Sequence, residues 1–167
     1  MRTLVTYLSS SGNTRRVAEA IRAAVPESTM AAMKDVGPLE GYDLIFAGFP
    51  VIAEGAPRKA RRFLARARGK KVALFLTHGM PASMGEFNAV VPNCRRAAAG
   101  CKLLGEFECQ GNMVSWMPKV LRLYPRGYVR RWARMSGEAH GAGHPNEEDL
   151  ERARAFAADV REKLTVT

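Results

Sequence analysis

Apolar and polar positions along the chain divide into short apolar runs and longer stretches with helical spacing. The short runs, rich in β-branched and aromatic residues, predict five strands, at residues 3–8, 28–33, 42–49, 72–76 and 102–109. In the longer stretches, apolar residues recur every three or four positions with charged residues between them. This spacing predicts helices at residues 14–25, 57–67, 87–99 and 147–164.

The order of these elements predicts an α/β fold. Apolar strands that alternate with amphipathic helices are typical of a parallel sheet covered on both faces. We therefore expect a three-layer, doubly wound, five-stranded parallel sheet in a single domain spanning residues 1–167. A basic segment with its own helical pattern, residues 112–145, is inserted before the last helix.

Length and composition are those of a globular protein, with 167 residues, 47% of them hydrophobic and 25% charged. Three cysteines without close spacing exclude a disulfide framework and a paired-cysteine zinc site. No apolar stretch approaches the roughly 20 residues of a membrane span, and no signal region precedes the first strand. These features predict a cytoplasmic protein.

The charge is strongly positive and unevenly distributed. Lysines and arginines number 26 against 16 acidic residues, a formal net charge of +10. Residues 55–85 carry eight basic residues and no acidic one, and residues 111–137 carry six basic residues and no acidic one. Such a balance favours anionic partners, although a solvated basic face is an equally good explanation of the first segment.

The most informative segment joins the first strand to the first helix. It consists of Ser9, Ser10, Ser11, Gly12, Asn13 and Thr14. The start of a helix offers unpaired backbone N–H groups, and hydroxyls and a glycine add donors and close backbone approach, so the loop suits a phosphate. The sequence contains neither the Walker pattern nor the dinucleotide-binding glycine pattern, and the loop lacks the cysteine that a phosphatase with a cysteine nucleophile would need.

This loop resembles the FMN phosphate loop of flavodoxins, usually written [TS]-x-[TS]-G-x-T. Ser9, Ser11, Gly12 and Thr14 fill its defined positions. The resemblance implies FMN as cofactor, the strand order 2-1-3-4-5, and phosphate binding by residues 9–14. It further implies that two later loops lie beside the flavin ring. The ring residues so implied are Pro50, Val51, Ile52, Ala53, Thr77, His78, Gly79 and Gly85.

Two departures from the flavodoxin pattern stand out. Neither ring loop carries the Trp and Tyr that commonly enclose the flavin, so Phe49 or an aromatic of the insert, such as Trp116, is expected to substitute. Flavodoxins are also typically acidic, whereas this chain is basic. Because complementary charge steers partner choice, the redox partner is expected to have an acidic surface.

The remaining chemistry-bearing side chains predict no catalytic residue and no metal site. His78 is either a proton donor near the flavin or, as we favour, a residue that ends its strand. His140 and His144 lack the cysteines or carboxylates of a metal site. The three cysteines, Cys94, Cys101 and Cys109, are expected to be small buried residues.

The insert interleaves aromatic and basic residues and is predicted to form two short helices broken at Pro125. It suits a lid over the flavin, a membrane or quinone surface, a protein partner, or, less well, nucleic acid. Its position and its Arg134–Glu138 ending resemble the long insert of flavodoxin-type, quinone-dependent protoporphyrinogen dehydrogenases, which are membrane-associated.

Three functions remain open from the sequence. The first is an FMN-binding electron carrier for a partner protein. The second is an oxidoreductase acting on a quinone, a tetrapyrrole or another conjugated small molecule, with peripheral membrane contact through the insert. The third is a module without flavin that interacts through the basic insert.

Overall fold

A computed structural model describes residues 1–165. Its centre is a five-stranded parallel sheet with the order β2-β1-β3-β4-β5, as predicted. The strands are β1 (Thr3–Tyr7), β2 (Thr29–Ala32), β3 (Leu44–Pro50), β4 (Lys71–His78) and β5 (Lys102–Gln110). The helices are α1 (Asn13–Ala24), α2 (Arg58–Arg66), α3 (Val90–Ala97), α4 (Met117–Leu121), α5 (Gly127–Trp132) and α6 (Glu147–Thr165), with 3-10 turns η1 (Gly85–Ala89) and η2 (Gly137–His140).

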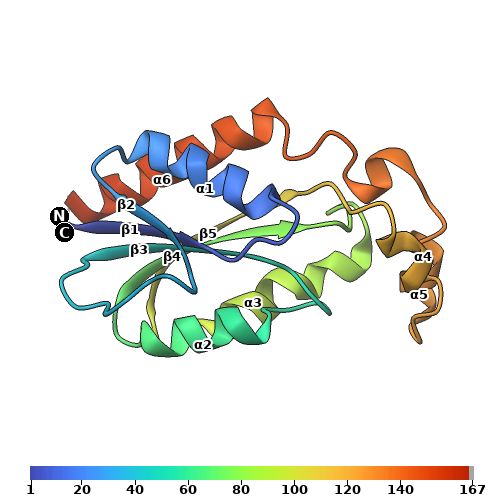
Figure 1. Ribbon diagram of the computed structural model, residues 1–167, viewed down its shortest axis with the longest axis horizontal. Helices are drawn as coiled ribbons and strands as arrows, with labels where there is room; N and C mark the ends of the chain where they lie inside the picture. Colours follow the sequence, from blue (N-terminus) through green and yellow to red (C-terminus); the bar gives the residue numbers. More distant parts are fainter. Residues whose placement is uncertain (166–167) are drawn as a thin grey trace.

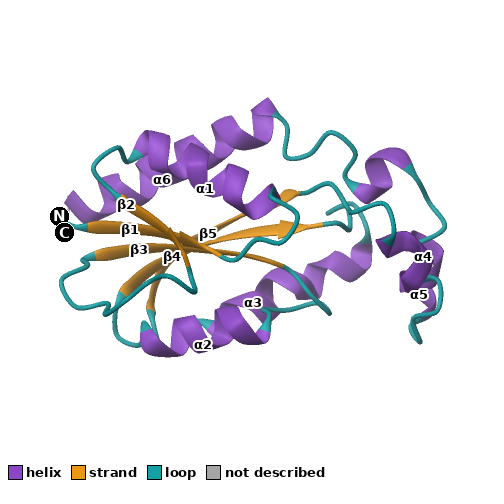
Figure 2. Ribbon diagram, viewed as in Figure 1, coloured by secondary structure: helices purple, strands orange, loops and turns teal. Residues whose placement is uncertain are grey.

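Helices cover both faces of the sheet, so the molecule has three layers (Figures 1 and 2). α1 and α6 lie on one face and α2 and α3 on the other. Successive strand residues point to opposite faces, which divides the core into two apolar clusters: Leu4 packs in the cluster under α2, and Val5 in the cluster under α1 and α6. Burial on both faces explains why the central strands β1, β3 and β4 are continuous apolar runs.

Most predicted ends lie within one or two residues of the observed ones, and two of the differences have a clear physical reason. The third strand is Leu44–Pro50 rather than 42–49, because the Tyr42 N–H donates to the Leu39 carbonyl in the preceding turn and the Asp43 N–H donates to the Arg2 carbonyl, just before β1. The predicted helix at 87–99 begins as η1 and becomes regular only in α3. Pro92 is the third residue of α3, where a missing backbone N–H costs no helical hydrogen bond.

The insert, predicted at residues 112–145, occupies the whole connection between β5 and α6 and caps the carboxyl ends of the strands, at the end of the molecule opposite Met1 (Figure 1). α4 and α5 are separated at Pro125, as predicted. The two ends of the insert are joined by backbone hydrogen bonds from Asn112 to His144 (2.8 Å) and from Met113 to His140 (2.9 Å). Gly141, with φ of 74°, passes so close to the Gly111 carbonyl that a side chain there would overlap it.

The cysteines behave largely as predicted. Cys94 and Cys109 are buried, and burial raises the pKa of their thiols to about 11 and about 12 respectively. Cys101 is only half-buried, because it follows the short turn before β5. Thiols so reluctant to ionise are poor nucleophiles, so these side chains act in packing.

Candidate functional site

The segment between β1 and α1 has the geometry of an anion site. Gly12 adopts φ of 92°, a left-handed conformation that favours glycine, and its N–H donates to Ser9 Oγ at 3.1 Å. Within residues 1–165, the backbone N–H groups of Ser10, Ser11, Asn13 and Thr14 have no hydrogen-bond acceptor. Unpaired N–H groups at the start of a helix favour a phosphate.

A cavity of about 440 Å³ extends from this loop along the carboxyl ends of the strands to the insert. No Asp, Glu, Lys or Arg lines it. Its lining is serine and asparagine at the loop end and mainly aliphatic or aromatic towards the insert. Such a cavity is within the usual size of a cofactor site, and it suits an amphiphilic ligand with a phosphate at one end and a flat ring at the other.

Most of the predicted site residues meet in this cavity. The residues that line it are Ser10, Ser11, Asn13, Pro50, Val51, Ile52, Ala53, Thr77, His78, Gly79 and Trp116. They come from separate segments of the chain that the parallel sheet brings to one edge.

Four predicted residues do not line the cavity. Ser9 is turned towards the Gly12 amide, and Gly12 contributes backbone shape. Thr14 is buried, and its hydroxyl forms a 2.8 Å hydrogen bond with the Thr77 hydroxyl, so only its backbone N–H is available at the loop. Gly85 lies outside because the chain turns away after Met80 and begins η1 there.

Phe49 does not substitute for a ring-stacking aromatic. Its side chain is completely buried in the core under α2. Successive side chains of β3 point to opposite faces of the sheet, and that of Phe49 points to the face covered by this helix rather than past the end of the strand. The insert instead supplies two tryptophans, the predicted Trp116 and the unpredicted Trp132. Trp132 is buried and anchored by a 2.6 Å hydrogen bond from Nε1 to the Ala139 carbonyl.

The loop after β3 contains a tight turn with two strained residues. Ile52 and Gly55 exchange backbone hydrogen bonds of 3.0 and 3.1 Å, which leaves Ala53 and Glu54 at the turn with φ of 50° and 62°. Left-handed conformations cost non-glycine residues roughly 1–2 kcal/mol each. A 2.9 Å hydrogen bond from Asn93 Nδ2 to the Glu54 carbonyl supports the turn from α3. Such strain is common where a backbone is held against a ligand.

The loop after β4 is fixed by His78. Its buried ring bonds through Nδ1 to the Met80 carbonyl at 2.6 Å and through Nε2 to a Glu108 carboxylate oxygen at 2.5 Å. The hydrogen bond with His78 holds the pKa of Glu108 below its usual range, against the opposing effect of burial. His78, the last residue of β4, thus connects the following loop to β5, and Glu108 is the partner that a single sequence did not identify.

Close packing ties the insert to both loops. Asn13 Nδ2 donates to the Asn112 carbonyl at 2.8 Å, which joins the phosphate loop to the start of the insert. A Cβ at Gly79 would lie 2.9 Å from Met113 Cε and 3.3 Å from the Trp132 ring. These contacts leave little room for a side chain at position 79, so the loop and the insert pack closely beside the cavity.

A second, mainly apolar cavity of about 210 Å³ adjoins the first. It lies between the loops after β3 and β4, η1, and the insert helices α4 and α5. The two cavities share the lining residues Val51, Ile52, Ala53, His78, Gly79, Leu121 and Trp132.

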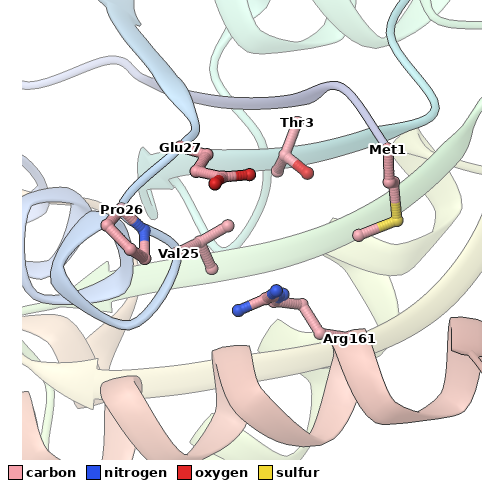
Figure 3. A pocket seen from close by; sticks show the side chains of 6 residues that line it. All are labelled: Met1, Thr3, Val25, Pro26, Glu27 and Arg161. Atoms are coloured by element: carbon pink, nitrogen blue, oxygen red, sulfur yellow. The ribbon is translucent and has the colours of Figure 1, made fainter.

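A separate hollow of about 240 Å³ lies at the opposite end of the sheet, between Thr3, the end of α1 and Arg161 of α6 (Figure 3). Arg161 donates to the Ala24 carbonyl at 3.3 Å and so braces α6 against α1. Ligands of open parallel sheets bind beyond the carboxyl ends of the strands, and this hollow lies at their amino ends.

Similarity to known proteins agrees with this geometry. Residues 4–158 match the Flavodoxin domain family. The chain is 26% identical over 186 aligned positions to the flavodoxin-like domain-containing protein BilS of Clostridioides difficile strain CD3, covering 99% of both chains. Among solved structures it is similar to oxidised Flavodoxin 2 from Bacillus cereus (22% identity, 98% and 99% of the chains covered, TM-score 0.64). It is also similar to a flavoprotein in complex with FMN from Lactobacillus acidophilus (21% identity, 64% and 92% covered, TM-score 0.54).

The loop fits FMN by the chemistry of its donors, which are unpaired backbone N–H groups and serine hydroxyls beside an apolar, aromatic-lined space. No helix among residues 1–165 has the length and apolar character needed to cross a membrane. With the family match spanning most of the sequence, the chain belongs to the flavodoxin domain family and is an FMN-binding flavoprotein of the electron-transferring kind.

Proposed function

We propose that this flavoprotein exchanges electrons with a small, apolar, conjugated molecule that enters the second cavity. The observation that carries the proposal is the position of this 210 Å³ cavity, which shares seven lining residues with the 440 Å³ cavity. A molecule there would lie next to the ring end of the cofactor site. When bound, FMN supplies one- or two-electron transfer.

The chain's own residues hold the cofactor in this proposal. The backbone N–H groups of Ser10, Ser11, Asn13 and Thr14, with the serine hydroxyls, bind the phosphate. Residues 50–53 and 77–79 lie along the ring, and Trp116 and Trp132 enclose it from the insert side. His78 keeps the second loop in place through Met80 and Glu108.

The lining of the second cavity favours an apolar ligand of one or two rings. Met80, Phe87, Tyr124 and Tyr128 supply aromatic and thioether contacts, and Glu54 is its only acidic lining residue. A cavity of about 150 Å³ accommodates benzene, so about 210 Å³ suits a quinone-sized molecule better than a tetrapyrrole. This supports a quinone as the electron acceptor and gives less support to a porphyrinogen substrate.

The cofactor half of the proposal is tested by titrating the apoprotein with FMN and following flavin fluorescence. Ser11→Asp places a carboxylate where the phosphate binds, and we expect it to lower FMN affinity at least tenfold. Ser136→Asp makes the same change at an exposed serine outside the cavity and serves as the control. Equal FMN affinity in wild type and Ser11→Asp would overturn the placement of the phosphate.

The substrate half is tested by reducing the FMN-loaded protein without oxygen and mixing it with a one-ring quinone. Val90 lines the second cavity and not the first, so Val90→Phe reduces the space for a ligand there, and we expect at least tenfold slower reoxidation with unchanged FMN affinity. Val91→Phe makes the same change beside it, outside both cavities, as the matched control. Unaltered reoxidation in Val90→Phe would place the electron acceptor elsewhere.

A second candidate is an electron carrier for a protein with an acidic surface. The observation that favours it is the set of exposed basic side chains on the insert, beside the cavity that holds the ring. Charge complementarity of this kind speeds encounter and selects the partner. In that case reoxidation by the small quinone would be slow in the wild type and insensitive to Val90→Phe.

A further inference from the structure

Large apolar side chains are exposed mainly at one end of the molecule. Within residues 1–165, six large hydrophobic residues are exposed. Met1 lies at the opposite end, Ile52 lies at the first cavity, and the other four, Trp116, Val120, Leu123 and Met135, belong to the insert. Apolar side chains concentrated in this way mark an interaction site.

α4 has two apolar faces with different surroundings. Met117, Leu121 and Tyr124 are spaced by four and three residues and line the cavities. Trp116, Val120 and Leu123 have the same spacing one residue earlier, and they are 57%, 55% and 87% exposed. The helical turns continue to Tyr124, whose N–H donates to the Leu121 carbonyl at 3.1 Å. The second face, which we call the outer stripe, is therefore a continuous apolar line.

Positive charge without a counter-charge flanks the outer stripe. Lys119 and Arg122 are exposed on the same turns and have no ion-pair partner within the described residues. By contrast, Arg126 lies 3.8 Å from Glu54, and Arg131 lies 2.8 Å from Glu86. No acidic residue occurs between positions 112 and 137. The surface that carries the outer stripe is thus apolar and cationic.

We propose that the outer stripe inserts into the surface of an anionic lipid bilayer. A short helix with an apolar face, a tryptophan and flanking lysine or arginine lies in the bilayer interface, with the cations at the headgroups. α4 lies with α5 at the end of the molecule away from Met1, where a flat bilayer can reach it (Figure 1). Each unneutralised cation near such a surface strengthens binding about fivefold.

The outer stripe lies beside the apolar end of the two cavities. Trp116 lines the first cavity and is mostly exposed, and the inward face of α4 lines both. A bilayer in contact with the outer stripe would adjoin the cavities, so that an apolar ligand reaches them without crossing water. Membrane binding itself does not depend on which molecule accepts electrons, and so it is tested separately.

The test is co-sedimentation of the FMN-loaded protein with phosphatidylcholine vesicles, with and without one quarter phosphatidylglycerol, at about 0.1 M salt. We expect binding to the anionic vesicles, and quenching of tryptophan emission by brominated lipid. Leu123→Glu should lower vesicle binding at least tenfold, because it buries a charge in the outer stripe. FMN affinity, measured on the same variant, should stay unchanged.

The second basic surface of the protein supplies the matched control. α2 exposes Arg61 and Arg62 but no large hydrophobic residue. Lys119→Glu/Arg122→Glu should lower binding at least tenfold, whereas Arg61→Glu/Arg62→Glu, with the same change in net charge, should retain most of it. Equal losses in the two double variants, or no binding of the wild type to anionic vesicles, would overturn the proposal; the second result would favour an acidic protein as the partner.

Discussion

The hydroxyl pair of Thr14 and Thr77 joins the phosphate loop to the end of β4, and its energetic contribution can be measured. The two oxygens lie 2.8 Å apart, and the residues are 1% and 3% exposed. Valine has the shape of threonine without the hydroxyl, so Thr14→Val leaves the Thr77 hydroxyl buried without this partner. An unsatisfied buried hydroxyl costs about 1–3 kcal/mol, and Thr77→Val should cost a similar amount.

The double variant Thr14→Val/Thr77→Val leaves neither hydroxyl unpaired. Replacing both partners of a buried hydrogen bond by apolar groups of the same shape is nearly neutral. The two single losses, about 2–6 kcal/mol together, should therefore exceed the loss in the double variant by at least about 1 kcal/mol. In thermal unfolding, each kcal/mol corresponds to roughly 2–4 °C for a chain of this size.

The assay is urea unfolding of the apoprotein for wild type, both single variants and the double variant. An equal slope of the unfolding free energy against urea concentration in all four proteins would establish that the substitutions change stability and not the compactness of the unfolded state. Single losses that add to the double loss within about 0.5 kcal/mol would refute the reasoning, since independent sites are additive. The Thr14 and Thr77 hydroxyls would then each have a hydrogen-bond partner other than one another.

Three further predictions follow from buried polar and close-packed positions. Glu108→Gln should lower the free energy of unfolding at pH 7 by roughly 1 kcal/mol, because the hydrogen bond to His78 loses its charge. Folding lowers the pKa of Glu108, so the stabilisation by its carboxylate is present above pH ~4.5 and fades below it. The free energies of unfolding measured in urea at pH 7 and pH 4 should therefore differ more for the wild type than for the variant. Thr6→Val should raise the melting temperature by roughly 2–4 °C, because the buried Thr6 Oγ1 has no hydrogen-bond partner within residues 1–165 and valine removes it. Gly48→Ala should destabilise by about 1–3 kcal/mol in urea unfolding, because a Cβ there would overlap the Phe75 ring in the core.

Each of these predictions has a comparison that could contradict it. Gly37→Ala adds the same methyl group where nothing lies within 4 Å, so a similar loss there would remove packing as the cause. Thr6→Ser keeps the hydroxyl and removes the methyl, so it should destabilise; stabilisation by both valine and serine would contradict the reasoning. A Glu108→Gln loss that is equal at both pH values would show that the carboxylate charge is not involved.

Local sequence was sufficient to predict the sheet and the phosphate loop. The three central strands, β1, β3 and β4, are apolar runs buried on both faces, and the loop at residues 9–14 carries its motif in consecutive positions, so no distant contact had to be known. Phe49, as one of two alternatives, and Gly85 were expected beside the flavin, but neither lines the cavity. Phe49 points into the core because successive side chains of a strand point to opposite faces of the sheet. Gly85 begins η1, after the chain has changed direction beyond Met80.

The missed site residues depend on contacts between distant positions. Trp132 reaches the cavity only because α5 folds back over the strand ends, and Glu108 meets His78 only because β4 and β5 are paired in register. The spacing within the insert predicted its two helices and the break at Pro125, but not the face that each presents. Which apolar face of α4 turns inward is decided by packing on the loops after β3 and β4.

The chain begins and α6 ends at the amino ends of the strands, at the end of the molecule farthest from α4 and α5 (Figure 1). A fusion or affinity handle at either end would therefore leave the cavities unobstructed. Protein attached to an electrode through such a handle would hold its flavin on the side away from the electrode, about the length of the sheet from the electrode surface. Direct electrochemistry would then be slow, whereas attachment through a cysteine introduced on the insert would bring the ring close to the electrode.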